Sequence, residues 1–72
     1  MNREEVINRL TADVDKVVMV SFNDGKAQTI KVHLVDDEGI VYFLVLSNQV
    51  DDRAYWTVFD DIESVLPIGD SK

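Results

Sequence analysis

The chain has no cysteine, only one proline and only three glycines among its 72 residues. Without cysteine it can form neither disulfides nor thiolate metal sites, and the single histidine, His33, cannot build a zinc site alone. No segment has the composition of a linker or a low-complexity region. A fold this small is marginally stable by itself, and with disulfides and zinc excluded, oligomerisation is the stabilising device that remains.

Basic residues are also scarce. Seven Lys and Arg stand against fourteen Asp and Glu, which gives a net charge of −7. The basic residues are scattered rather than clustered, and an acidic surface repels the phosphate backbone, so general nucleic-acid binding is disfavoured.

Long apolar runs are missing as well. The longest, Ile40 to Leu46, is far too short to span a bilayer. The charged N-terminus lacks the apolar run of a signal peptide. We therefore expect a cytoplasmic protein with no membrane association.

The first residues predict a helix over about residues 2–11. Val6 and Leu10 lie one helical turn apart on the same face. Asn2 can cap the helix, and Glu5 stands three residues later as the partner in a capping box. A helix of this length needs its apolar face packed against other elements.

Alternating apolar residues then predict two strands, from Val17 to Phe22 and from Gln28 to Val35. Between them, Asp24 and Gly25 are the structural residues of a tight turn, because glycine tolerates the positive φ that hairpin turns require. The second strand is expected to direct three apolar side chains inward: Ile30, Val32 and Leu34.

Three further strands are expected at Ile40–Leu46, Ala54–Phe59 and Ile62–Leu66, and both faces of the first of these are apolar. A polar loop is expected over Ser47–Arg53, and a frayed tail over 69–72. The pattern of one helix and five short strands within residues 17–67 predicts a single, mainly β domain over residues 1–72. We expect a strongly bent, antiparallel SH3-like barrel.

Residues Val18 to Asp36 resemble the first motif of the Sm/Lsm family, including its Hfq-like bacterial members. Alternating apolar residues, then Asp24-Gly25, then Val32 and Asp36 stand at the family's spacing, and Val58–Pro67 resembles the family's closing strands. The resemblance implies an Sm-like barrel and a homo-oligomeric ring, in which the fourth strand of one subunit pairs with the fifth strand of the next. The subunit interface implied in this way contains Tyr55, Thr57, Phe59, Ile62 and Val65.

The chain departs from the family where RNA is bound. Gly39-Ile40 stand where eukaryotic and archaeal members carry Met-Asn, whose Asn contacts a uridine base. Asp60-Asp61 replace the Arg-Gly of the second motif and equally the Lys-His of the bacterial branch, and Ile30 replaces the second glycine of the first motif. The resemblance therefore implies a divergent or weakened RNA site.

Two acidic loops are the candidate ligand sites. By the resemblance, Asp36, Asp37, Glu38 and Gly39 face a central pore together with Asp60 and Asp61. Carboxylates suit calcium or magnesium, but Asp is also a favoured turn residue. The solvated turn is the favoured interpretation, and we expect neither a metal nor a cofactor.

The aromatic residues could stack on bases, or they could form a core or a subunit interface. These are Tyr42, Phe43, Tyr55, Trp56 and Phe59. Base-stacking platforms usually accompany basic grooves, so the second interpretation is favoured. No serine stands in a recognisable nucleophile motif with His33, and we expect no enzyme.

Two functional hypotheses remain. The first is a non-enzymatic, Sm-like, ring-forming protein that is associated with RNA through a divergent or weakened site. The second is a protein-interaction adaptor with an SH3-like barrel and no nucleic-acid role, which the two-sided apolar strand and the aromatic residues indicate.

Overall fold

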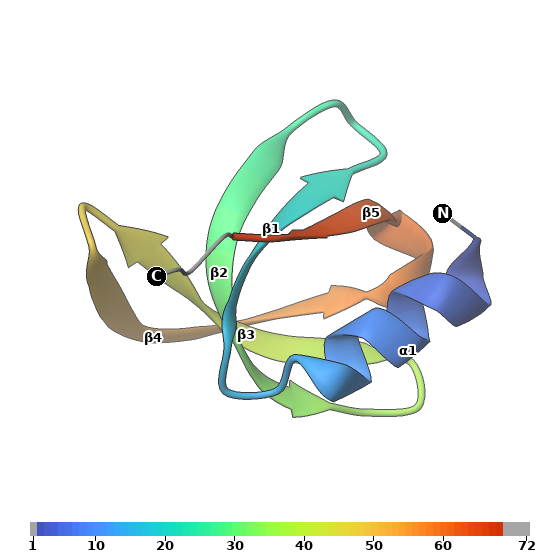
Figure 1. Cartoon of the computed structure of the whole chain (residues 1–72), viewed down its shortest axis with the longest axis horizontal. Coiled ribbons are helices and arrows are strands. Elements are labelled where there is room, and N and C mark those ends of the chain that lie inside the picture. The colour runs from blue at the N-terminus through green and yellow to red at the C-terminus, as the bar shows by residue number, and fades with distance from the viewer. Residues whose placement is uncertain (1, 69–72) are drawn as a thin grey trace.

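In a computed structural model, which describes residues 2–68, one helix precedes five strands (Figure 1). In chain order the elements are α1 (Arg3–Ala12), β1 (Val17–Phe22), β2 (Ala27–Val35), β3 (Gly39–Leu46), β4 (Gln49–Val58), the 3₁₀ turn η1 (Phe59–Asp61) and β5 (Ile62–Pro67). The strands form one curved antiparallel sheet in the order β4-β3-β2-β1-β5. The predicted helix and five antiparallel strands are confirmed, while the tail predicted at 69–72 lies outside the described residues.

Helix α1 begins with the predicted capping box. The Asn2 Oδ1 atom accepts a hydrogen bond from the Glu5 backbone N–H at 2.8 Å, and the Glu5 carboxylate accepts one from the Asn2 N–H at 3.1 Å. Val6 and Leu10 are buried where α1 lies against β5, η1 and β2. Because ten residues are too few for a stable isolated helix, this packing holds α1 in place. No helix within residues 2–68 is long and apolar enough to cross a membrane.

A bulge in β2 overturns one predicted side-chain direction. Val32 lies opposite Tyr42, and Leu34 lies opposite Val41, so His33 is an extra residue on β2. An extra residue reverses the alternation of side chains that follow it. Leu34 therefore points outward and is 54% exposed, and the prediction that it points inward is wrong.

The prediction of a polar loop over Ser47–Arg53 is also wrong. Ser47 and Asn48 have positive φ values of 52° and 66°, and the residues on either side of them pair as neighbours in β3 and β4. Positive φ at both central residues is typical of the two-residue turns that match the twist of a hairpin. The charged residues 51–53 therefore belong to β4, and they lie close to solvent because β4 is an edge strand.

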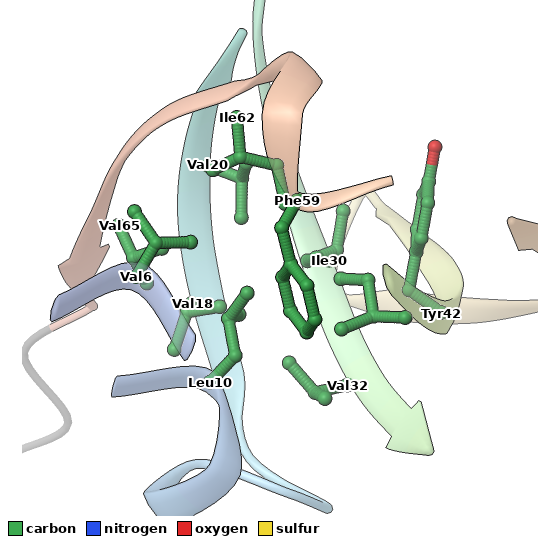
Figure 2. Close-up of a cluster of buried hydrophobic side chains, with 11 residues drawn as sticks. Val6, Leu10, Val18, Val20, Ile30, Val32, Tyr42, Phe59, Ile62 and Val65 are labelled. Carbon is green, nitrogen blue, oxygen red and sulfur yellow. The ribbon is translucent and has the colours of Figure 1, made fainter. Parts of the chain in front are cut away.

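The core lies between α1 and the inner face of the sheet, with the Phe59 ring in its centre (Figure 2). Phe59 is 1% exposed and comes from η1, so this short turn supplies the largest fully buried side chain of the core. The other core residues are Val6, Leu10, Val18, Val20, Ile30, Val32, Ile40, Tyr42, Ile62 and Val65.

Candidate functional site

The two acidic segments that the sequence singles out lie next to each other. The Phe59 backbone N–H donates to the Glu38 carbonyl oxygen at 2.9 Å, which joins η1 to the turn between β2 and β3. Gly39 lies against the Thr57 and Val58 backbone so closely that a Cβ atom would overlap the Thr57 carbonyl oxygen. The structure thus brings residues 36–39 beside Asp60 and Asp61, with all of their carboxylates exposed.

These carboxylates act in local structure. The Asp36 Oδ1 atom accepts from the Asp37 N–H at 2.6 Å, which stabilises the turn. Asp60 forms an exposed ion pair with Arg3, with an Oδ1–Nε distance of 3.5 Å. Within residues 2–68, no three Asp, Glu or His side chains converge in a way that could hold a metal ion. The geometry therefore gives the acidic turns a structural role and offers no support for a cation site.

The Asp24-Gly25 turn also contacts η1. The Asp24 Oδ1 atom accepts from the Lys26 N–H at 2.9 Å, and Gly25 has a φ of 91°. Asn23 donates from Nδ2 to the Asp60 carbonyl oxygen at 2.6 Å and from its backbone N–H to the Asp61 carbonyl oxygen at 3.0 Å. Sequence reasoning missed this role of Asn23, because its partners lie far away in the chain.

An open depression of about 460 Å³ lies where the Asp24-Gly25 turn meets η1 and β4. Its lining residues are Phe22, Asn23, Asp24, Thr57 and Asp61. Among them are the carboxylates of Asp24 and Asp61 and the hydroxyl of Thr57, with no histidine or lysine.

Three residues predicted at a subunit interface have their side chains in the chain's own core. Phe59, Ile62 and Val65 are 1%, 6% and 0% exposed, respectively. They point inward because η1 turns Phe59 toward α1 and because β5 lies across the same core. Their place at a subunit interface stays a prediction. Tyr55 and Thr57 are half-buried on β4, and an interface there stays a prediction.

The free strand edges are more informative than the loops. Strands β4 and β5 occupy the two ends of the sheet, so one side of each has no partner strand among residues 2–68. Along an antiparallel strand, residues whose backbone groups bond the neighbouring strand alternate with residues whose backbone groups point away from it. The Phe59–Glu38 hydrogen bond shows which residues of β4 belong to each set. By this pattern the backbone N–H and C=O groups of Ala54, Trp56 and Val58 face the free edge.

The β5 edge follows from the same reasoning. The Phe22 N–H donates to the Lys26 carbonyl oxygen, so the backbone of Phe22 and of every second residue before it bonds β2. The residues between them, including Met19, bond β5. Leu66, opposite Met19, therefore bonds β1, and Val65 and Pro67 face the free edge. Pro67 has no N–H to offer there, a position typical of proline in edge strands.

Within the described part of the chain, His33 and the serines lie on different elements. His33 packs against Phe43 on the outer face of the sheet, with ring centroids 5.1 Å apart and an interplanar angle of 58°. Ser21 and Ser64 pair with each other across β1 and β5, and Ser47 lies in the β3–β4 turn. None of them therefore stands in the place of a nucleophile beside His33.

The aromatic residues divide between the two faces of the sheet. On the inner face the Tyr42 and Tyr55 rings stack with centroids 5.7 Å apart, and Tyr42 belongs to the core. On the outer face Trp56 is 48% exposed. Burial, and secondarily the neighbouring Tyr55, raise the pKa of the Tyr42 hydroxyl above its ordinary value.

This raised pKa predicts a loss of stability in alkali. Ionisation of Tyr42 is easier in the unfolded chain, so its contribution to stability is complete below the ordinary tyrosine pKa of about 10 and is lost as pH rises through the higher pKa of the folded state. In Tyr55→Phe, Tyr42 is the single tyrosine, and its tyrosinate absorbance should appear at higher pH in the folded protein than in urea. Coincident titrations in the two conditions would contradict the burial of Tyr42.

No protein-family model, curated protein or solved structure matches the chain. The order of an N-terminal helix and five antiparallel strands is compatible with the Sm-like topology.

Proposed function

We propose that this chain is a non-enzymatic, Sm-like subunit that assembles with copies of itself into a homo-oligomeric ring. The observation that carries the proposal is the unprotected edge of β4 from Ala54 to Val58. In the proposed ring, this edge pairs with the β5 edge of the next subunit, and the curved sheet completes an Sm-like barrel.

The β4 edge has the properties of a strand that can pair with another chain. Natural edge strands are usually blunted by charges, proline or bulges, because an open edge pairs with other chains. The charged residues of β4 lie at its beginning, over 51–53, whereas 54–58 reads Ala-Tyr-Trp-Thr-Val and carries no charge. Aromatic and β-branched residues of this kind favour pairing.

Pairing of β4 with β5 of a neighbour joins two different surfaces of the same chain. Such a head-to-tail contact repeats around an axis and gives a closed ring when the rotation closes. Apolar side chains on both edge strands would lose water in the process. Val50 and Trp56 on β4 are 47% and 48% exposed, and Leu66 on β5 is 52% exposed.

Ala54→Pro tests the pairing directly. The Ala54 N–H faces the free edge, so proline removes a donor to the neighbour without removing a β3–β4 hydrogen bond. We expect the dissociation constant of the assembly to rise at least tenfold, measured by light scattering behind a sizing column over a dilution series.

Ala54→Val is the matched control, because it keeps the N–H and adds a β-branched side chain at the same place. It should assemble like the parent chain. Equal assembly of the proline and valine variants, both with parental circular dichroism, would place the contact elsewhere.

We propose that RNA binds weakly, through a site that diverges from that of the Sm/Lsm family. The net charge of −7 and the acidic residues beside η1 oppose phosphate binding. We expect labelled oligo(U) and oligo(A) to bind in low salt and to be released at physiological salt, measured by fluorescence anisotropy. Absence of binding even in low salt would remove RNA association and leave the adaptor function, for which the exposed Trp56 on the outer face is the supporting observation.

A further inference from the structure

Three apolar side chains form a row across the outer face of the sheet. Leu34 on β2 lies opposite Val41 on β3, and Val41 lies opposite Trp56 on β4. Directly opposed residues of antiparallel strands project from the same face with neighbouring Cβ atoms. Leu34 and Trp56 are 54% and 48% exposed, and Val41 is half-buried between them. We call Leu34, Val41 and Trp56 the outer row.

The outer row is a consequence of the bulge at His33. With regular alternation through residue 33, Leu34 would point into the core and would not lie beside Val41 on the outer face. Exposing a leucine beside a tryptophan costs solvation free energy, which a partner would recover by covering both side chains. The row therefore has the character of a contact surface.

A turn with three carboxylates lies at the end of this row. Asp36, Asp37 and Glu38 connect β2 to β3, one residue after Leu34 and two residues before Val41, and all three are exposed. The only basic residue on the neighbouring β2 positions is Lys31, which pairs with Phe43 on the side of the row away from the turn. The outer row thus has a strongly negative end.

We infer that the outer row and the acidic turn bind a basic, amphipathic segment of a partner protein. Lysine or arginine side chains would meet the carboxylates, and the exposed indole of Trp56 is the best aromatic surface for a cation. Apolar side chains of the same segment would cover Leu34 and Val41. Tryptophan is also among the residue types enriched at the positions that dominate binding at protein interfaces.

Charge complementarity selects this occupant over others. A nucleic acid would bring phosphates to the carboxylates of the turn. A second copy, facing this surface with its own, would bring two acidic turns together at a net charge of −7 for each chain. A cationic segment gains from the same charges that repel these alternatives.

The test uses a labelled synthetic peptide of alternating lysine and leucine, with a glutamate–leucine peptide as its counterpart. Trp56 is the single tryptophan, so its fluorescence reports contact at the row itself. We expect a saturable blue shift with the lysine peptide, weakened by salt, and no shift with the glutamate peptide. Equal binding of both peptides, or of neither, would overturn the inference.

Matched variants separate a local site from the general negative charge of the chain. Asp36→Asn with Asp37→Asn should weaken binding of the lysine peptide at least fivefold by anisotropy, and Trp56→Ala at least tenfold. The controls are Asp51→Asn with Asp52→Asn, which removes the same charge from β4, and Leu46→Ala, which truncates a similarly exposed apolar residue. We expect less than a twofold change in each control, and equal losses in test and control variants would overturn the inference.

Discussion

Phe59→Ala is expected to lower the free energy of unfolding by about 3–5 kcal/mol, the range for truncation of a buried aromatic ring. Phe59 is 1% exposed and fills the space between α1, η1 and the sheet (Figure 2). Its removal would leave a cavity bordered by elements from both ends of the chain. Urea unfolding followed by circular dichroism measures the change.

The control for this prediction is Trp56→Ala. It removes a larger aromatic ring, but one that is 48% exposed on the outer face. We expect a loss within about 1 kcal/mol, because substitutions at exposed positions are usually small in effect. A loss for Phe59→Ala no greater than that for Trp56→Ala would show that η1 does not supply the centre of the core.

Gly39→Ala is expected to destabilise the fold by about 3 kcal/mol, at the upper end of the range for overpacking. A Cβ atom at Gly39 would overlap the Thr57 carbonyl oxygen and approach the Val58 Cα atom. Backbone atoms of a paired strand cannot move aside as a flexible side chain can. The same substitution should also disturb the Phe59–Glu38 hydrogen bond, which is the link between the two acidic segments.

Gly25→Ala provides the comparison. Nothing lies within 4 Å of a Cβ atom at Gly25, but the residue has a φ of 91°. Its cost is therefore conformational only, about 1–2 kcal/mol. Urea unfolding should rank Gly39→Ala as the more damaging change, and the reverse order would mean that the β3–β4 pairing at Gly39 is looser than described.

Local sequence patterns were sufficient where the structure depends on neighbours in the chain. Asn2 and Glu5 form the predicted capping box, and β1 begins and ends at the predicted residues, Val17 and Phe22. The turn with Asp24 and Gly25 also depends only on nearby atoms. Capping, alternation and glycine at positive φ all depend on a few neighbouring residues, so they can be predicted from the sequence.

The errors arose where the sheet departs from regular alternation. The extra residue His33 reverses the direction of Leu34, and no local residue type marks a bulge there. The turn at Ser47-Asn48 was not predicted, because its first residue is not the glycine or asparagine typical of such turns. As a result, the charged start of β4 was predicted to be a loop.

The candidate site shows the same limit. Proximity of the segment 36–39 to η1 rests on a hydrogen bond between Glu38 and Phe59, residues far apart in the chain. Burial of Phe59 and Val65 in the chain's own core depends on how α1 closes over the sheet. The outer row of Leu34, Val41 and Trp56 could not be predicted, because its formation requires the bulge.

The most direct measurement of the central claim is the native mass of the unmodified chain, by light scattering behind a sizing column. Edge-to-edge pairing of β4 with β5 predicts a single species of about five to seven chains that persists on dilution, as a closed ring would. A monomer at every concentration would contradict the ring and leave both strand edges without the partner proposed for them.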